Sequence, residues 1–123
     1  MSSRLSGTLL CRAGDDRVAF AAQDVASIES PSTFGGLAGS ASAAFHGASI
    51  TGRILVAISG EGVGVDALEI DAEPRTLLPT PGVLVRIAGG SVRGFILVRG
   101  ALWPVLSLVD FGRYLAPAPR EAA

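Results

Sequence analysis

The stretch GFILVRGALWPVLSL, residues 94–108, decides the fold of this chain. It consists of two apolar runs, at 95–98 and 102–108, joined by the short segment at 99–101. Gly100 in that segment can adopt a positive φ without steric cost, and such residues favour tight turns between strands. The apolar runs are rich in residue types that suit a half-buried sheet. The stretch therefore predicts a β-hairpin.

Three residues of this hairpin bear on function. Pro104 lacks a backbone donor, so the second strand should lie at a sheet edge or carry a bulge. Arg99 lies at the bend, where the turn holds its charge between two strands that bury most of their side chains. With Trp103 nearby to exclude water, an apolar hairpin with a fixed cation suits the docking of a partner. The alternative is a core hairpin whose Arg99 simply faces water.

The composition limits the size of the domain and the kind of partner. A chain of 123 residues suits one compact domain or two very small barrels that share a core. Its net charge of −1 argues against binding to nucleic acid or to an anionic membrane. Charged residues make up 17% of the chain, below the roughly 25% usual for soluble domains, so we expect apolar surface that a partner can cover. Alanine and glycine in loops would explain the same composition without such a surface.

The single cysteine and the short apolar runs indicate the compartment. Cys11 has no second cysteine with which to form an internal disulfide, which fits a reducing cytoplasm. Its position in the apolar run at 9–11 predicts a buried thiol. No apolar run approaches the ~18 residues of a membrane span. We therefore expect a cytoplasmic protein without direct membrane insertion.

An internal repeat is visible when the chain is aligned with itself at an offset of 45 residues. Residues 9–11 then align with 54–56, and Asp16 aligns with Glu61. Each copy reads as a strand, an acidic turn, a strand and a short apolar segment. Two such units predict two small antiparallel sheets or barrels, each too small to bury a core alone, that pack on one another.

The other segments are assigned from their apolar runs and turn residues. Further strands are expected at 9–11, 17–21, 25–28, 54–58, 63–65, 67–70 and 83–87. Residues 31–49 are rich in Gly, Ser and Ala, which predicts a flexible loop with one short helical turn at most. A short helix is expected over 109–115, whereas the leader at 1–7 should fray and the tail at 116–123 should be mobile.

No combination of residues predicts catalysis, a metal site or a cofactor. His46 is the only histidine and lies in the loop at 31–49, without a nucleophile elbow that would place it in a catalytic triad. Residues 59–64 faintly resemble a dinucleotide loop, but the third glycine comes one position early and a hairpin turn explains them better. The four acidic residues between 66 and 73 lack the order of an EF-hand, so we interpret them as a solvated sheet edge. One histidine and one cysteine do not make the usual zinc sets.

The chain resembles the CheW-like coupling proteins of bacterial chemosensory systems, and the resemblance covers most of residues 8–115. The stretch GFILVRGALWPVLSLVDF carries the most specific match. It is similar to the family's series of a glycine, an Arg-Gly pair, a Pro-Val pair and a leucine after an apolar residue. The residues at these positions are Gly94, Arg99, Gly100, Pro104, Val105 and Leu108.

The opening of the chain is also similar to this family. LLCRAGDDRVAFAAQDVASIE, residues 9–29, resembles the family's first hairpin and the apolar segment that follows it. Val25 and Ile28 lie at the apolar positions of that segment, and Ser27 replaces the usual acidic residue between them. The Arg-Gly pair departs from the family pattern because it follows the second repeat rather than the first. Which of the family's two barrels the C-terminal half corresponds to is therefore left open.

The resemblance implies an all-β fold of two small antiparallel, SH3-like β-barrels that share an apolar core, with at most one or two short helices. We expect a single CheW-like domain over residues 1–123. Residues 8–50 would form a truncated first barrel plus a loop, 51–115 the second barrel, and 116–123 the tail. Because the chain is shorter than a usual member, it resembles a shortened variant of the family.

The resemblance also implies a non-catalytic signal-transduction adaptor. Its expected partner is the cytoplasmic tip of a chemoreceptor, and contact with the regulatory domain of a CheA-type histidine kinase depends on strands that the shorter chain lacks. The residues expected to bind the partner are Val25, Ile28, Gly94, Arg99, Gly100, Trp103 and Pro104.

Two other functions are weighed against the adaptor. One is a self-associating structural module that pairs through an open sheet edge as a homodimer. The other is a small-molecule enzyme, which would need a deep pocket lined by His46 and two carboxylates.

Overall fold

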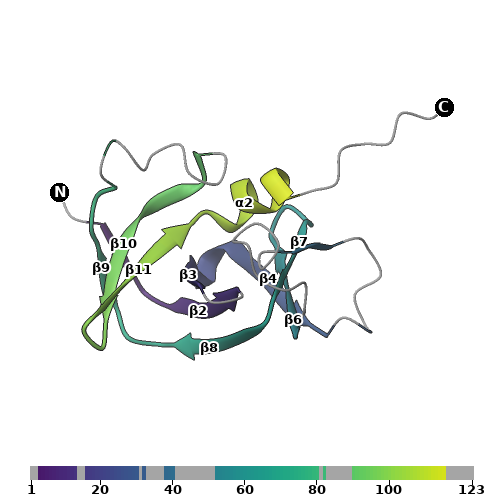
Figure 1. The fold of residues 1–123 in the computed structure, drawn as a ribbon, viewed down its shortest axis with the longest axis horizontal. Coiled ribbons are helices and arrows are strands. Elements are labelled where there is room, and N and C mark those ends of the chain that lie inside the picture. Colours follow the sequence, from purple (N-terminus) through teal and green to yellow (C-terminus); the bar gives the residue numbers. More distant parts are fainter. Residues whose placement is uncertain are drawn as a thin grey trace.

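The computed structural model describes residues 3–13, 16–30, 32, 38–40, 52–80, 82 and 90–115. Strands dominate this part of the chain, and a single α-helix follows the last of them (Figure 1). The elements are, in chain order, β1 (Ser3–Leu5), β2 (Thr8–Ala13), β3 (Asp16–Ala21), the 3-10 helix η1 (Ala22–Asp24), β4 (Val25–Glu29), β5 (Ala38–Ser40), β6 (Arg53–Ala57), β7 (Gly62–Val65), β8 (Ala67–Asp71), β9 (Arg75–Leu77), β10 (Val92–Val98), β11 (Ala101–Leu106) and α2 (Leu108–Leu115). The expected all-β fold with one or two short helices is confirmed.

The described strands form three sheets. Their orders are β1-β9 in a two-stranded sheet, β10-β11-β3-β2-β8 in a five-stranded sheet and β4-β6-β7-β5 in a four-stranded sheet. Neighbouring strands are antiparallel except for β11 with β3 and β5 with β7, which are parallel. These sheets therefore differ from the purely antiparallel barrels that we expected, and none closes into a barrel through the residues that the structure describes.

The five-stranded sheet comes close to closure at one point. The chain leaves β8, forms the short β9 and reaches β10, where Leu78 and Phe95 exchange two backbone hydrogen bonds of 2.7 and 2.9 Å. Pro74 and Pro79 bracket β9 and limit it to three residues. A strand of that length between two residues without backbone donors cannot extend the ladder along β10.

The repeat at an offset of 45 residues reappears in the strand topology. The hairpin β2–β3 corresponds to the hairpin β6–β7, and each is followed by a strand that crosses to the other hairpin. Thus β4 follows β3 but pairs with β6, whereas β8 follows β7 but pairs with β2. The registers differ by one residue, because Leu9 lies opposite Phe20 whereas Ile54 lies opposite Gly64 rather than Val65.

This exchange of strands binds the two halves of the chain together. The five-stranded sheet takes β2 and β3 from the segment at 8–50 and its other three strands from the segment at 51–115. The four-stranded sheet likewise takes β4 and β5 from the first segment and β6 and β7 from the second. The boundary near residue 50 is therefore a division of the chain and not a division between sheets.

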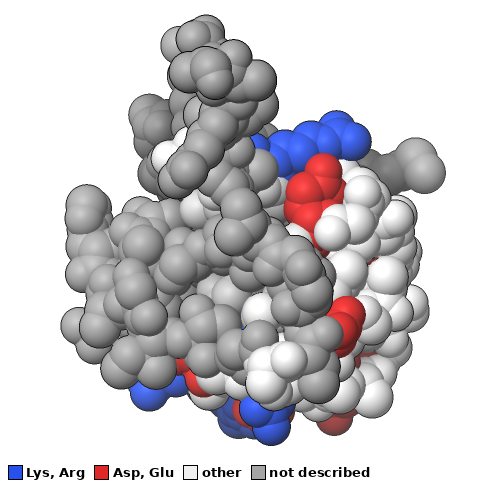
Figure 2. All heavy atoms as spheres, turned by 90° about the vertical axis from the view of Figure 1, so that its right-hand side faces the viewer, with Lys and Arg blue, Asp and Glu red and all other residues white. Residues whose placement is uncertain are grey.

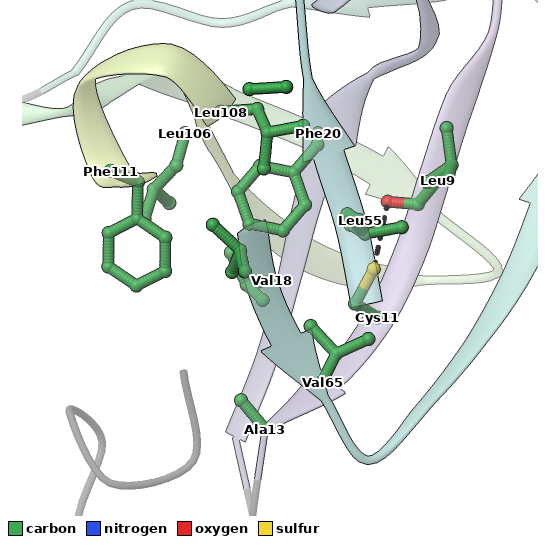
Figure 3. Close-up of a cluster of buried hydrophobic side chains, with 12 residues drawn as sticks. Leu9, Cys11, Ala13, Val18, Phe20, Leu55, Val65, Leu106, Leu108 and Phe111 are labelled. Atoms are coloured by element: carbon green, nitrogen blue, oxygen red, sulfur yellow. Dashed lines mark hydrogen bonds between the residues drawn. The ribbon is translucent and has the colours of Figure 1, made fainter. Parts of the chain in front are cut away.

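The buried side chains form two clusters on the two sides of the β2–β3 hairpin. Alternate residues of β2 explain this arrangement, since Leu9 and Cys11 belong to one cluster and Leu10 to the other. The first cluster is shared, because Leu55 and Val65 of the four-stranded sheet pack in it beside Phe20 of the five-stranded sheet (Figure 3). This shared apolar core was expected from the repeat.

Cys11 lies within the shared core, as the sequence predicted. Its Sγ lies 3.8 Å from the carbonyl oxygen of Leu9, and the residue is fully buried. Removal from water disfavours the thiolate, so burial raises the pKa of the Cys11 thiol to about 12. The thiol is therefore a structural group and not a reactive one.

The helix α2 closes one end of the shared core. Its first turn is held by Ser107, whose Oγ accepts a hydrogen bond from the Asp110 amide at 3.3 Å, and by Asp24, whose Oδ2 accepts one from the Leu108 amide at 3.3 Å. Phe111 is fully buried and its ring centroid lies 6.0 Å from that of Phe20. Among the described residues, no helix combines the length and apolar character needed to cross a membrane.

Some sequence-based expectations need correction or lie outside the described residues. The leader at 1–7 is not simply frayed, because β1 pairs with β9 and Leu5 packs on the second apolar cluster. The loop at 31–49 contains the short strand β5, which a Gly/Ser/Ala composition concealed. The expected strand at 83–87, His46 and the tail at 116–123 lie outside the residues described.

Candidate partner-binding site

The turn between β10 and β11 has the geometry that the sequence suggested. Arg99 and Gly100 are its two central residues, with φ of 49° and 78°, and Val98 lies opposite Ala101. Two successive residues with positive φ make a turn whose twist matches that of the flanking strands. Gly100 adopts this conformation freely, whereas Arg99 is the only residue other than glycine with a positive φ in the described part of the chain.

The β10–β11 hairpin is buried on one side only. Ile96, Val98, Trp103 and Val105 alternate onto its inner face and form most of the second apolar cluster. Trp103 is only 9% exposed, so it supports the hairpin from inside and offers little surface to a partner. The expectation that Trp103 covers a docking surface therefore does not fit its position.

The outer face of the hairpin carries an exposed apolar strip. Leu97 lies opposite Leu102, and Phe95 lies opposite Pro104. Leu97 is 55% exposed and Leu102 is 59% exposed, while Phe95 and Pro104 are half-buried. We call these four residues the outer strip. Directly opposed side chains in a sheet form one continuous surface, so the strip is an apolar patch held on a rigid support.

Sequence reasoning found Pro104 but missed the other three residues of the outer strip. The signal was present in the Arg-Gly turn. Once Arg99 and Gly100 are the central residues, Val98 and Ala101 form the first pair, and Leu97 and Leu102 form the second pair on the opposite face. Counting outward from the turn would therefore have paired the two leucines on one face of the hairpin, and the structure shows that this face is open.

Pro104 lies in the interior of the five-stranded sheet rather than at its edge, which corrects the expectation from its missing donor. The backbone N–H and C=O of Phe95 both point to Leu78, so Phe95 does not exchange hydrogen bonds with Pro104 across the hairpin. The nitrogen of Pro104 then faces β3, and β11 pairs with β3 only at Val105 and Leu106. Pro104 therefore lies just before the residues of β11 that pair with β3, so the ladder between these strands needs no N–H from it. The one irregularity of the hairpin lies in β10, between Val92 and Gly94.

Gly94 allows the chain after β9 to approach β10. A Cβ at this position would clash with the carbonyl oxygen of Leu78 and with the Leu77 side chain. Gly94 is therefore needed for the close approach that sets up the bridge between Leu78 and Phe95. Its role is structural, in that it positions the outer strip and does not itself offer a contact.

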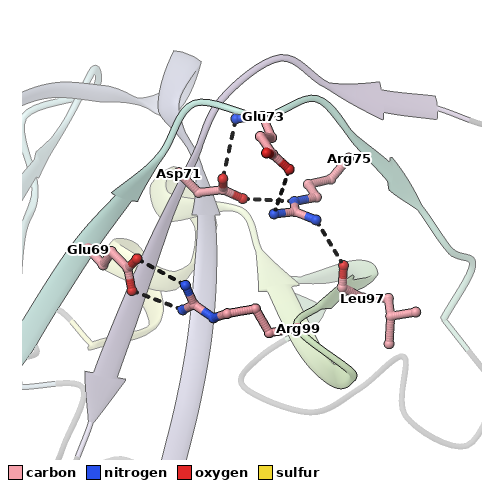
Figure 4. A network of polar contacts seen from close by, with 6 residues as sticks. All are labelled: Glu69, Asp71, Glu73, Arg75, Leu97 and Arg99. Carbon is pink, nitrogen blue, oxygen red and sulfur yellow. Dashed lines mark hydrogen bonds and ion pairs between the residues drawn. The ribbon is translucent and has the colours of Figure 1, made fainter.

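Arg99, in the turn between β10 and β11, reaches β8, the strand at the opposite edge of the five-stranded sheet. Its Nη1 and Nη2 donate to the two carboxylate oxygens of Glu69 at 3.2 and 3.0 Å (Figure 4). This fork of two hydrogen bonds lowers the pKa of the Glu69 carboxyl and raises the pKa of Arg99. Both side chains are more than half exposed, so the pair fixes the orientation of Arg99 more than it stabilises the fold.

A second ion pair extends this network toward β9. Arg75 donates to Asp71 at 2.8 Å and also reaches the Leu97 carbonyl oxygen at 3.5 Å (Figure 4). The hydrogen bond from Arg75 is the main cause of the lowered pKa of Asp71. The acidic residues at 69, 71 and 73 are partnered by arginines, and Glu69 and Asp71 belong to β8, the edge strand that the sequence predicted. In the described part of the chain, no cluster of side chains is suited to hold a metal ion.

Val25 and Ile28 lie on a different sheet from the hairpin. Both belong to β4, where Val25 packs against the shared core and Ile28 is 39% exposed. Figure 1 places β4 in the half of the molecule opposite the turn of β10 and β11. The structure thus does not bring these two residues together with Arg99 in one groove.

The side of the molecule that carries the four-stranded sheet is shown in Figure 2. Where its residues are described, uncharged residues predominate, with acidic side chains among them and basic side chains toward the top and bottom of the view. Ile58, which follows β6, is 65% exposed. Among the described residues this part of the molecule therefore exposes single apolar side chains, Ile28 and Ile58.

Comparison with known proteins gives no match: no protein-family model fits this chain, and no curated protein is significantly similar to it.

Proposed function

We propose that this protein is a non-catalytic adaptor of a bacterial chemosensory system, which binds the helical cytoplasmic tip of a chemoreceptor through the outer strip of the β10–β11 hairpin. The proposal joins two lines of reasoning. The Arg-Gly and Pro-Val series in this hairpin resembles CheW-like coupling proteins, and the hairpin carries Leu97 and Leu102 as an exposed pair. The exposed pair is the observation that carries the proposal.

The physical basis is an apolar contact on a rigid support. The inner face of the hairpin is anchored by the second apolar cluster, so little ordering is needed when a partner binds the outer face. An amphipathic helix that lies along the strip would cover Leu97 and Leu102 with its own apolar residues. Contact with the regulatory domain of a histidine kinase is a further part of the proposal, for which the four-stranded sheet, with Ile28 exposed on β4, is the available second surface.

The size of the effect can be worked out from the exposed fractions. Complete burial of a leucine contributes about 1.5–3 kcal/mol, so covering the exposed half of each is worth about 1 kcal/mol. Losing both contacts therefore costs about 2 kcal/mol, which corresponds to a roughly 30-fold weaker affinity.

The test is a titration of a receptor-tip helical hairpin and, separately, of a kinase regulatory domain. The variant Leu97→Ser/Leu102→Ser should bind the receptor tip roughly 30-fold more weakly, with an unchanged circular dichroism spectrum. The control is Ile58→Ser, which removes a similarly exposed apolar residue just after β6 and should bind the receptor tip like the wild type. Wild-type affinity in the double variant would exclude the outer strip as the binding surface.

The alternative function is self-association through an open sheet edge. Both β4 and β5 end the four-stranded sheet without a further partner strand among the described residues. Unpaired edges can join a second copy of the same chain. Sedimentation at micromolar concentration separates the two functions, because the adaptor should remain monomeric without its receptor and the structural module should dimerise.

A further inference from the structure

A pocket lies between β8 and the β10–β11 hairpin, and residues of β2 and β3 also line it. Its volume is about 440 Å³. Three arginines and one glutamate contribute to its lining, Arg12, Arg17, Arg99 and Glu69, which gives a net charge of +2 at neutral pH. The chain as a whole has ten basic residues and a net charge of −1, so this is a local concentration of positive charge.

Arg12 and Arg17 carry the uncompensated part of this charge. They lie directly opposite each other on β2 and β3, in a position where like charges repel. The salt bridges among the described residues involve Arg75, Arg93, Arg99 and Arg113, and Arg99 is bound to Glu69. The guanidinium of Arg17 lies 5.7 Å from the ring centroid of Trp103, which holds it over the aromatic face.

We propose that Arg12 and Arg17 together bind a carboxylate presented by an acidic segment of a partner protein. Each guanidinium group offers several N–H donors from directly opposed positions on neighbouring strands, and a carboxylate accepts such donors through both oxygens. A bound carboxylate would also remove the repulsion between the two arginines. The site is distinct from the outer strip, because Arg12 and Arg17 line the pocket whereas the strip lies on the outer face of the hairpin.

The exposure of the site favours a protein segment over a free small molecule. Arg12 and Arg17 are both exposed, and the Arg99 and Glu69 side chains that also line the pocket are 65% and 58% exposed. Small-molecule sites usually bury most of their ligand, roughly 70–90% of its surface. A side chain carried by a larger partner does not need that enclosure, because the rest of the partner supplies further contacts.

A direct test uses Trp103, the only tryptophan of the chain, as the reporter. The full-length protein is titrated with a helical peptide that has glutamates at two positions four residues apart, and with a matched peptide that has glutamines there. Trp103 fluorescence should respond to the glutamate peptide with at least tenfold higher affinity. In Arg12→Gln/Arg17→Gln this preference should vanish, whereas Arg53→Gln, which removes an exposed arginine of β6, should keep it.

Stability provides a second readout that separates a binding role from a structural one. Because the two arginines repel each other, Arg12→Gln should melt at the same temperature as the wild type or higher while it binds the glutamate peptide more weakly. A lower melting temperature with unchanged peptide affinity would show that Arg12 is structural and overturn the proposal.

Two further outcomes would also overturn it. Equal affinity for the two peptides would show that the carboxylate is not recognised, and competition by inorganic phosphate at the same concentration as the peptide would indicate a general small-anion site. Failure of this site is distinguishable from failure of the outer strip, because Leu97→Ser/Leu102→Ser should leave binding of the glutamate peptide unchanged.

Discussion

Replacing Phe111 with alanine tests whether α2 is an integral part of the core that joins the two sheets. Phe111 is fully buried in the shared core beside Phe20, at 6.0 Å between ring centroids. Truncation of a buried phenylalanine costs about 3–5 kcal/mol through lost transfer energy and the cavity left behind. The lost aromatic pair contributes to the upper part of that range.

The expected result is a large shift in urea unfolding followed by circular dichroism. With a slope of about 2 kcal/mol per molar urea, a loss of about 4 kcal/mol lowers the midpoint by about 2 M. The control is Tyr114→Ala on the same helix, since Tyr114 is 55% exposed and its ring stacks on Phe111 from outside. This substitution should cost about 1 kcal/mol or less.

The variant Phe111→Leu keeps the test informative if the alanine variant does not fold. It retains most of the side-chain volume and should cost about 1–2 kcal/mol. The reasoning is refuted if Phe111→Ala is no more destabilising than Tyr114→Ala. That result would mean that the helix only rests on the sheets and that the shared core is complete without it.

Two further predictions concern the contacts of β10 with the chain after β9 and the ion pairs of β8. Gly94→Ala should lower stability by about 2 kcal/mol or more, because its Cβ must displace the Leu78 carbonyl, whereas Gly82→Ala, with open space around it, should stay within about 0.5 kcal/mol in the same thermal melts. The pKa values of Glu69 and Asp71 are lowered by their arginine partners, so the stabilisation from these pairs is present above the unfolded-state pKa of about 4 and is lost as the pH falls through the lower folded-state values. The urea midpoint should therefore be constant from about pH 7 to 5 and decrease below about pH 4. In Arg99→Ala this decrease should be smaller. An identical pH dependence in Arg99→Ala would show that the pair with Glu69 contributes nothing to stability.

Local sequence patterns predicted the conformations of neighbouring residues well. The apolar runs around Arg99 and Gly100 predicted the hairpin, and the apolar setting of Cys11 predicted its burial. The 45-residue repeat likewise predicted two similar hairpins with a shared core. These features depend on turn preferences and on the alternation of side chains along a strand, both of which are properties of a few consecutive residues.

Only the tertiary structure decided which strands pair and which faces remain open. The sequence of β4 does not indicate that it joins β6 rather than the hairpin before it, and nothing near Arg99 indicates that Glu69, thirty residues earlier, is its partner. The exposure of Leu97 and Leu102 was equally hidden, because an apolar residue on a strand has the same local pattern whether its face is covered or open. Pairing between distant strands depends on how both faces of each sheet are packed, and that is settled by the whole chain at once.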